Sequence, residues 1–525
     1  MNTRLRLLSS FLALLASCAA TTHTAVTTPV APTKAVDDRI HVVVLHTNDV
    51  HGQVLPRKAT WLKRDPAPMV GGLPRAGAMV RELRVKAEAA GAVVFVVDSG
   101  DWYQGTPEGL LDDGAGFARA LALVGYDAMC VGNHDFDHGV PNLVNILKET
   151  HVPAVAANLD EKATGKPVDW VVPWRIVERG GLRVAFVGLV TPITPEITHP
   201  DAQKIEFVDP AKALTRAQEQ LKGKADWIVP LTHLGVDGDK ELATAHPELG
   251  LIVGGHSHTF LRNGERAGTT LIVQSGSKVS AVGRVDLWLD RETKRVVESK
   301  STLIDLDEEP KPEFVNKPLE DVCKTLVTRT EERMKQPLGE LTAAATTPGK
   351  GELVSSTMGN LVTDALRAHA RSDVAIMNRG GIRAGMQAGT VTRRDVFEVM
   401  PFDNNVTVLK MTGAEVEQMV RNAVEGKAHS GIEVSGIVIE YSLVGDAKKL
   451  GRVSMGGAPL DPTRVYRVAM NSFMADGGDA YIAKVAPGDK RTDDVALIRD
   501  VLEELFVNRG KVTPATDNRY VVTKP

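Results

Sequence analysis

Runs of apolar, largely β-branched residues recur through the first half of the chain, and each gives way abruptly to sequence rich in Gly, Asp, Asn or His. The runs are His41–Thr47, Ala92–Asp98, Asp127–Val131, Val184–Val190, Trp227–Thr232, Leu251–Gly254 and Leu271–Gln274. Continuous apolar runs of about four to eight residues are typical of strands buried on both faces. Helix-forming sequence between them, such as Arg75–Ala90, indicates an α/β fold.

The pattern changes between residues 305 and 350. Residues 305–318 are acidic and contain proline, 319–334 are polar and helix-prone, and 342–350 resemble a loop. Beyond them, Thr392 with Asp395 and Thr412 with Glu415 have the spacing of helix capping boxes. Strands are predicted at Val374–Met377, Val406–Leu409, Ile437–Tyr441 and Val465–Met470. We therefore expect two α/β domains, residues 40–310 and 341–525, joined by a linker helix within 311–340.

The N-terminus has the pattern of an export signal. Arg4 and Arg6 precede an apolar stretch, Leu7–Ala16, that is too short to span a bilayer. Its end, Leu15 to Cys18, resembles a bacterial lipobox, which predicts a signal peptide over 1–17, lipid modification of Cys18 and a Thr/Pro-rich tether over 18–39. The expected location is periplasmic or at the cell surface, with a lipid anchor as the sole membrane contact. The alternative is a plain secretory signal in which Cys18 has no role.

Composition excludes several other classes of protein. Lys and Arg total 62 against 66 for Asp and Glu, so no basic excess indicates binding to a nucleic acid polymer. The hydrophobic share of 43% and charged share of 24% are ordinary for a soluble globular chain, not for a disordered or polytopic membrane protein. Three cysteines cannot form a disulfide scaffold. Composition does not predict the oligomeric state.

Five short motifs stand at the exits of predicted strands, where α/β folds place their sites. They are Thr47–Gly52 (TNDVHG), Asp98–Asp101 (DSGD), Gly132–Asp137 (GNHDFD), Thr232–Gly235 (THLG) and Gly254–His258 (GGHSH). Asp49 and His51 are two residues apart, so extended backbone would point both side chains the same way. Together the motifs supply nitrogen and oxygen ligands without thiolates, as suits Zn, Mn, Fe, Co or Ni. His46, just before the first motif, is expected to be a hydrogen-bonded core residue.

This constellation resembles the calcineurin-like metallophosphoesterases and, in more detail, the bacterial 5′-nucleotidase / UDP-sugar hydrolase family, over residues 41–525. The resemblance implies an N-terminal αββα sandwich joined by a helix to a C-terminal α/β substrate-binding domain. It also implies two divalent ions such as Zn, Mn or Co. Asp49, His51 and His258 would hold one ion, Asn133, His233 and His256 the other, and Asp101 both.

The same resemblance implies roles for residues outside the metal set. His134 is similar to the family's catalytic histidine, and Asp137 would orient it. In the second domain the motifs that match the family are Met358–Leu361, Asn378–Arg383, Pro401–Asn404 and Asn471–Asp479. Phe402 and Phe473 would sandwich a nucleobase, Asp479 would bind the ribose hydroxyls, Arg383 would pair with phosphate, and Asn378 would help fix the ligand.

One position departs from the family pattern. Glu352 stands where family members usually have an arginine, and Arg379, where many have glycine, is a candidate replacement for that charge. The expected function is release of phosphate from nucleoside 5′-monophosphates, with UDP-sugars as further substrates. A 2′,3′-cyclic nucleotide phosphodiesterase and a thiosulfohydrolase are alternatives on the same fold. A non-catalytic nucleotide-binding surface lipoprotein is an alternative of another class, although it predicts losses among the ligands and none is found.

Overall fold

The structure is a computed structural model that describes residues 39–523 except 60, 61, 63, 350 and 351. The predicted signal peptide, Cys18 and the tether up to residue 38 lie outside the described residues. Among the helices that are described, none is both long and apolar enough to cross a membrane.

Two six-stranded sheets form the core of the first lobe, residues 39–334. The first has the order β17 (Val296–Asp305), β16 (Ala281–Asp290), β1 (Arg39–Thr47), β4 (Val93–Asp98), β5 (Ala128–Cys130), β6 (Ala154–Val155). The second has the order β14 (Glu265–Ala267), β15 (Thr270–Val273), β13 (Leu251–Val253), β12 (Trp227–His233), β10 (Leu182–Val190), β9 (Trp174–Arg179). All seven apolar runs of this half are strands, which confirms the prediction.

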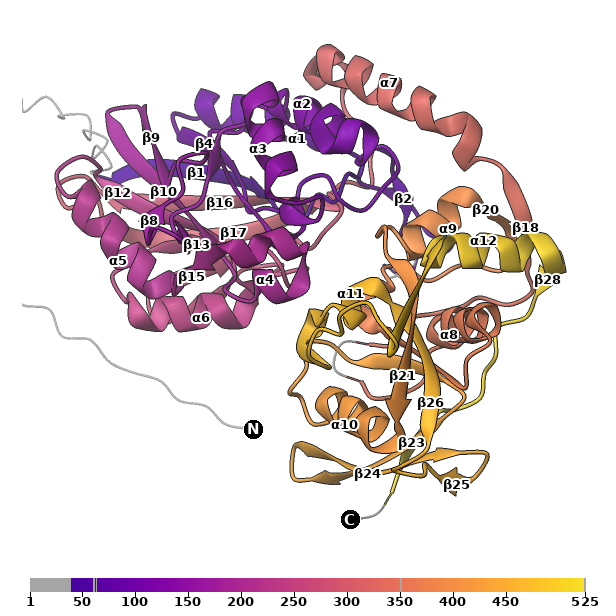
Figure 1. Ribbon diagram of the computed structural model, residues 1–525. Helices are drawn as coiled ribbons and strands as arrows, with labels where there is room; N and C mark the ends of the chain where they lie inside the picture. Colours follow the sequence, from indigo (N-terminus) through magenta and orange to yellow (C-terminus); the bar gives the residue numbers. More distant parts are fainter. Residues whose placement is uncertain (1–38, 60–61, 63, 350–351, 524–525) are drawn as a thin grey trace, which may run out of the picture. The chain divides into compact units, whose positions relative to one another are not determined.

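The sheets lie face to face because their central strands are apolar on both sides. Val42 and Val44 of β1 share one buried core with Val184 and Phe186 of β10. Outside it, α1 (Leu73–Ala89), α2 (Ala115–Ala122) and α3 (Val140–Thr150) cover the first sheet, and α5 (Pro210–Leu221) and α6 (Gly235–Ala245) cover the second (Figure 1). This αββα sandwich confirms the predicted fold.

Helix α7 (Lys317–Met334) follows the sandwich, where the polar stretch 319–334 predicts a helix. Its apolar side chains Leu319, Cys323 and Leu326 are buried in the same core as α1 and α2. The Asn316 side chain caps its start by accepting a hydrogen bond from the Leu319 backbone N–H at 3.3 Å. The linker helix thus packs against the first lobe.

The second lobe, residues 337–523, is also α/β. Its central sheet has the order β22 (Ile432–Ser435), β19 (Val374–Asn378), β26 (Val465–Asn471), β21 (Asn405–Thr412), β27 (Arg491–Leu497). Two smaller sheets have the orders β25 (Ala458–Pro459), β24 (Ala447–Met455), β23 (Val438–Val444), β29 (Tyr520–Val522) and β20 (Gly389–Thr392), β18 (Pro337–Leu341), β28 (Lys511–Val512). The helices are α8 (Thr357–Ala370), α9 (Arg393–Val399), α10 (Gly413–Val424), α11 (Ser472–Ala475) and α12 (Ile498–Arg509). Thr392 and Thr412 cap α9 and α10 through the predicted capping boxes.

Short elements complete the fold. They are β2 (Arg57–Lys58), β3 (Met69–Val70), β7 (Leu159–Glu161), β8 (Lys166–Pro167), β11 (Ile205–Phe207) and α4 (Thr194–Ile197). Of these, α4 matters most for function because it lies in a segment that lines the pocket described below.

Candidate active site

The seven predicted metal ligands come together at the carboxyl ends of strands from both sheets. Asp49 and His51 follow β1, Asp101 follows β4, Asn133 follows β5, His233 ends β12, and His256 and His258 follow β13. β1, β4 and β5 are parallel neighbours, as are β12 and β13. Their loops therefore open at the same edge, and the topology alone gathers motifs that are more than 200 residues apart in the chain.

Four of these residues form a compact group. One ligand atom from each of Asp49, His51, Asp101 and His258 lies within 4.8 Å of the other three. His258 Nε2 is 3.0 Å from His51 Nε2 and 3.2 Å from Asp49 Oδ1. Asp49, His51 and Asp101 are almost fully buried, so the group is closed to bulk solvent on the side of the sheets.

The backbone at these ligands is left-handed. Asp49, His51, Asp101, His256 and His258 have φ values of 51°, 49°, 61°, 75° and 55°. The extended backbone expected for the Asp49–His51 pair is therefore wrong: the side chains converge because each turn reverses sharply. Hydrogen bonds from Asp49 N to Gly100 O (2.9 Å) and from His51 N to Asp101 O (3.0 Å) hold the turn in place. Such strained conformations persist only where surrounding contacts enforce them, and they cluster at functional sites.

The other three candidates lie beside Asp101. His233 Nε2 is 3.1 Å from Asp101 Oδ2, and His256 Nδ1 is 2.9 Å from Asn133 Oδ1. The His233 and His256 rings meet edge to face with centroids 5.2 Å apart. Asp101 thus faces both groups of side chains.

The protonation of the imidazoles fits a bound cation. His51 Nδ1 is 2.8 Å from the Gln104 carbonyl and His233 Nδ1 is 2.6 Å from the Ser99 carbonyl, so both Nδ1 atoms must donate. The Nε2 atoms of both rings then face the carboxylates of the cluster, and His233 Nε2 lies within ion-pair distance of Asp101. Burial lowers the pKa of His233, but Asp101 and Asp49 outweigh burial and raise it to about 10. The cluster therefore attracts positive charge, and its donor set suits transition-metal ions.

Two supporting residues lie inside the motifs, but sequence reasoning assigned them no role. Asn48 Nδ2 donates to Asp49 Oδ2 at 2.6 Å and so fixes that carboxylate. The Asp135 carboxylate accepts backbone N–H groups of Gly132 (2.8 Å), Trp102 (2.8 Å) and Asp101 (3.2 Å). These bonds tie the second and third motifs together and thereby set the position of Asp101.

His46 behaves differently from the expectation. It is fully buried, as predicted for a core residue, but neither ring nitrogen has a hydrogen-bond partner within the described part of the chain. Burial lowers the pKa of His46 to about 3, so the ring is neutral at ordinary pH.

His134 and Asp137 form a hydrogen-bonded pair beside the cluster. His134 Nδ1 is 2.7 Å from Asp137 Oδ2, and the His134 backbone N–H donates to Asp101 Oδ1 at 2.8 Å. Burial lowers the pKa of His134, but the carboxylates of Asp137 and Asp101 outweigh it and hold that pKa above its ordinary value. The His134 ring stacks on Phe402 of the second lobe, with centroids 5.5 Å apart and planes inclined by 28°.

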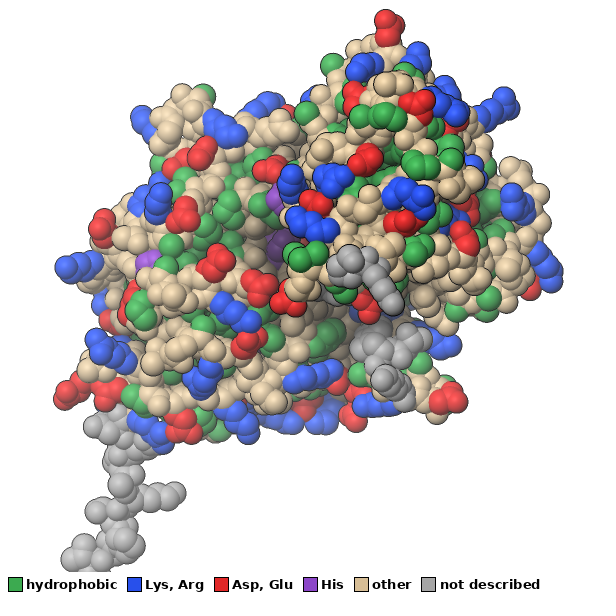
Figure 2. Space-filling model, turned by 90° about the horizontal axis from the view of Figure 1, so that it is seen from below, with side chains coloured by type: hydrophobic (Ala, Val, Ile, Leu, Met, Phe, Trp, Pro, Cys, Tyr) green, Lys and Arg blue, Asp and Glu red, His purple; other side chains and the backbone are tan. Residues whose placement is uncertain are grey.

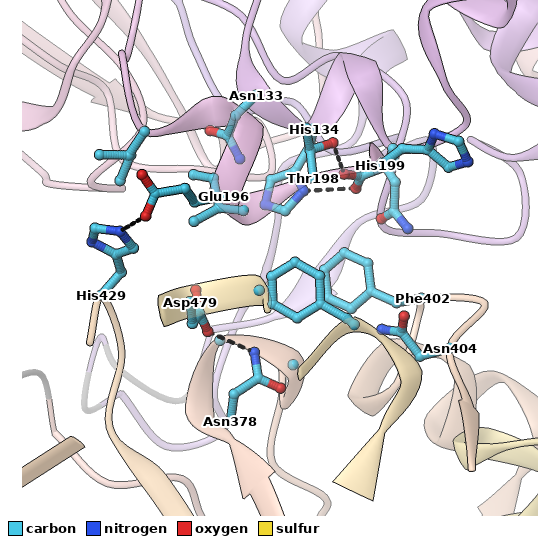
Figure 3. A pocket seen from close by; sticks show the side chains of 18 of the residues that line it. Asn133, His134, Glu196, Thr198, His199, Asn378, Phe402, Asn404, His429 and Asp479 are labelled. Atoms are coloured by element: carbon cyan, nitrogen blue, oxygen red, sulfur yellow. Dashed lines mark hydrogen bonds and ion pairs between the residues drawn. The ribbon is translucent and has the colours of Figure 1, made fainter. Parts of the chain in front are cut away.

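A pocket of about 710 Å³ joins these groups to the second lobe. Its lining includes all five predicted substrate residues, namely Asn378, Arg383, Phe402, Phe473 and Asp479, together with metal candidates from the first lobe. Figure 3 shows the Asn378–Asp479 pair and Phe402 facing His134 and Asn133 across this space. On the face drawn in Figure 2, histidine side chains are recessed below the surface with hydrophobic side chains beside them. Pockets of 300–1,000 Å³ are typical of small-molecule sites.

The polar residues of the second lobe are held in place by one another. Asn378 Nδ2 donates to Asp479 Oδ2 at 2.9 Å, and Asn471 Nδ2 donates to Asn378 Oδ1 at 2.8 Å. Asp479 has a left-handed backbone (φ 57°), and burial raises its pKa. Arg383 lies over the Phe402 ring at 5.7 Å and has no carboxylate within 4.0 Å in the described part of the chain. Its guanidinium is therefore available to an anion.

Arg379 does not supply a replacement charge to the pocket. Its Nε lies 2.9 Å from Glu433 Oε1, and its other nitrogens donate to the carbonyls of Glu352 and Val354. The pocket lining contains Gly380 and Arg383 but not Arg379. The prediction that Arg379 replaces the missing family arginine is therefore wrong. Its ion-pair partner, the buried Glu433, is far along the sequence, and no local pattern indicates that the two residues pair.

Comparison with known families agrees with this geometry. Residues 42–260 match the model of the calcineurin-like phosphoesterases, and residues 337–485 match that of the 5′-nucleotidase C-terminal domain. Fold and site thus define a calcineurin-like phosphoesterase, an enzyme that hydrolyses phosphoesters, with a candidate metal-binding cluster at Asp49, His51, Asp101 and His258.

Individual relatives narrow the class. The chain is 31% identical to protein UshA of Yersinia enterocolitica over 493 residues, which covers 85% of this chain and 87% of that protein. It is 28% identical to a 5′-nucleotidase of Vibrio cholerae over 516 residues, covering 89% and 91%. The solved structure of a 5′-nucleotidase precursor from Thermus thermophilus superposes with a TM-score of 0.80 at 27% identity, covering 92% of this chain and 99% of that one. The chain belongs to the family of UshA and the bacterial 5′-nucleotidases.

Proposed function

We propose that the protein is a 5′-nucleotidase that releases phosphate from nucleoside 5′-monophosphates with two divalent ions. The observation that carries the proposal is a single pocket lined by metal-ligand candidates, by the His134–Asp137 pair and by Phe402 and Phe473. A phosphatase of small esters needs the first two sets, whereas a pair of aromatic rings beside them suits a nucleobase. UDP-sugars are further candidate substrates, and Zn, Mn or Co are candidate ions.

The metal ligands divide between two proposed sites. Asp49, His51 and His258 would hold one ion, Asn133, His233 and His256 the other, and Asp101 both. When bound, such ions activate water and neutralise charge on the phosphate. The fit rests on the buried Nε2 atoms of His51 and His233 and on the carboxylates of Asp49 and Asp101 that face them.

His134 and Arg383 are the proposed groups that act on phosphate directly. Asp137 fixes the tautomer of His134 by accepting from Nδ1, which leaves Nε2 without a hydrogen bond to any described residue. A donor held there stabilises oxygen atoms as negative charge develops on them. Arg383, which has no carboxylate partner among the described residues, offers a planar fork of donors that matches phosphate oxygens.

The second lobe would bind the nucleoside. Phe402 and Phe473 would stack against the base, and Asp479 would accept hydrogen bonds from the ribose hydroxyls. Asn378 supports Asp479 by donating to its Oδ2. Base stacking contributes about 1–3 kcal/mol and tolerates different bases, so the proposed enzyme accepts several nucleotides.

The location and domain limits are part of the proposal. Export by a signal peptide over 1–17 and anchoring through lipidated Cys18 would place the enzyme at a membrane without a spanning helix. The catalytic domain would cover 40–310 and the substrate domain 341–525, with a linker over 311–340. A Cys18→Ala variant should move from the membrane fraction to the soluble fraction, and an unchanged distribution would contradict the anchor.

The substrate proposal is tested by phosphate release from AMP, UDP-glucose and 2′,3′-cyclic AMP with Mn²⁺ or Co²⁺. AMP should be the best substrate of the three. A clear preference for the cyclic nucleotide would identify a phosphodiesterase instead. Binding of AMP without turnover of any substrate would support the non-catalytic alternative.

A further inference from the structure

The Asp137 carboxylate has a second partner on the side away from His134. Thr198 Oγ1 donates to Asp137 Oδ1 at 2.7 Å, while Asp137 Oδ2 faces His134 Nδ1 at 2.7 Å. Figure 3 shows Thr198 beside His134 in the pocket. Both carboxylate oxygens are thus used, one by each neighbour, so the carboxylate cannot rotate without losing both bonds.

Burial makes this second bond significant. Thr198 is 7% exposed, and the side chains of His134 and Asp137 are 14% and 11% exposed. Water therefore has little access to replace the threonine hydroxyl. A hydrogen bond to a charged group in such surroundings is stronger than a bond between neutral groups, and the row of three groups is mutually polarised.

Thr198 also connects the pair to the second lobe. It follows α4 directly as its C-cap residue, and Oε2 of Glu196 in α4 is 2.7 Å from His429 Nε2 of the second lobe. His429 in turn donates its backbone N–H to the Asp479 carbonyl at 3.0 Å. Figure 3 shows the Glu196–His429 contact on the same side of the pocket as Asp479. The segment made of α4 and Thr198 therefore bonds to Asp137 through Thr198 and to His429 through Glu196. His429 in turn is bonded to the proposed ribose-binding loop.

We propose that Thr198 is a positioning residue that aligns His134 through Asp137, and that the Glu196–His429 contact couples this alignment to engagement of the second lobe. The inference rests on the proposed function for the choice of substrate and for the role of His134. In this proposal Thr198 does not contact the substrate. Thr198 increases the fraction of time that His134 is correctly oriented. Thr198 should therefore change turnover and leave substrate affinity unchanged.

The first test compares Thr198→Val with Thr198→Ser on AMP. Valine keeps the shape and removes the hydroxyl, so kcat should fall by about tenfold with KM unchanged, since one such bond corresponds to roughly one decade in rate. Serine restores a hydroxyl and should recover most of the loss. Thr150→Val is the matched control, because Thr150 is 8% exposed and loses one hydroxyl bond to the Ile146 carbonyl outside the pocket. A fall in kcat for the control equal to that of Thr198→Val would overturn the proposal.

A double-mutant cycle separates positioning from general destabilisation. In an Asp137→Ala background, Thr198→Val should have no further effect on kcat, because its only route to His134 is gone. Independent, multiplicative losses would overturn the proposal. Likewise, Glu196→Gln should lower kcat by about two- to fivefold in the wild-type background and not in Thr198→Val. If the losses in kcat from Glu196→Gln and Thr198→Val multiply in the double variant, the coupling through α4 is refuted.

Failure of the proposed function gives a different result. A wild-type protein that hydrolyses p-nitrophenyl phosphate but not AMP would refute the nucleotide substrate, while the Thr198 cycle could still be measured on p-nitrophenyl phosphate. If the wild type hydrolyses AMP and Thr198→Val has the same kcat, the positioning role of Thr198 is refuted while the proposed function stands.

Discussion

Replacing Phe402 by leucine should reduce the preference that we expect the enzyme to show for a nucleotide over a sugar phosphate. The Phe402 ring lies between the two functional halves of the pocket, stacked on His134 at 5.5 Å and covered by Arg383 at 5.7 Å. It belongs to none of the buried apolar cores in the described part of the chain. Phe473, by contrast, packs against a core and has Gly478 directly on its ring. Phe402 can therefore be changed with less damage to folding.

The magnitude follows from stacking. A base on an aromatic ring gains about 1–3 kcal/mol, and leucine retains part of the apolar contact. We expect a loss of about 1–2 kcal/mol, which corresponds to about 5- to 30-fold in kcat/KM for AMP. Ribose 5-phosphate has the same phosphate and a similar sugar but no base to stack on the ring. The kcat/KM of the variant for this substrate should therefore stay within about twofold of the wild-type value, a difference of about 0.4 kcal/mol.

The assay is phosphate release from AMP and ribose 5-phosphate by the same preparations, reported as the ratio of the two kcat/KM values. Phe397→Leu is the control, because Phe397 also carries an arginine, Arg499 at 5.0 Å, but does not line the pocket. Its ratio should equal that of the wild type. Equal losses on both substrates in Phe402→Leu would refute the stacking role and would point to its contact with His134 instead.

Three further outcomes follow from the structure. Asp101→Asn should lower the metal content measured by mass spectrometry as well as AMP hydrolysis, because Asp101 faces both ligand groups; full metal content would refute its bridging role. His46→Leu should stabilise the fold in acid: burial lowers the pKa of His46 to about 3, so between pH 6.5 and 3 the unfolded chain binds a proton that the folded chain lacks. The wild type should therefore lose up to about 1.4 kcal/mol of unfolding free energy per pH unit relative to the variant, measured by urea unfolding at pH 7 and 5.5. Arg394→Met should lower the unfolding free energy by about 2–3 kcal/mol, because it leaves buried Glu108 with Thr330 as its one side-chain partner among the described residues; an unchanged urea midpoint would contradict that.

The fold of the first lobe was predictable because its strands are buried on both faces. The β16–β17 hairpin was not predicted, since one face of β16 lies in the core while Arg284, Asp286 and Trp288 on the other are partly exposed. β16 lacks the continuous apolar run by which the other strands of this lobe were predicted, although its alternating pattern is itself typical of a half-buried strand. Both capping boxes of the second lobe were visible because their hydrogen bonds are local.

The site was predictable where its residues lie in short motifs and unpredictable where partners come from elsewhere. Residues 47–52 and 132–137 are recognisable as motifs from their composition. The left-handed turns at Asp49 and His51 are not, because a positive φ is uncommon for residues other than glycine and nothing in the local sequence indicates it. Thr198 lies in a proline-rich segment with no motif, and its bond to Asp137 spans 61 positions. The sequence did not indicate that Arg379 is paired, because Glu433, its ion-pair partner, is 54 positions away.

Metal titration of AMP hydrolysis tests the two-ion site most directly. Metal-free protein should be inactive, and activity should return with Mn²⁺ and saturate at two equivalents per chain. Activity that survives exhaustive chelation, or that saturates at one equivalent, would contradict a site built from Asp49, His51, Asp101, Asn133, His233, His256 and His258.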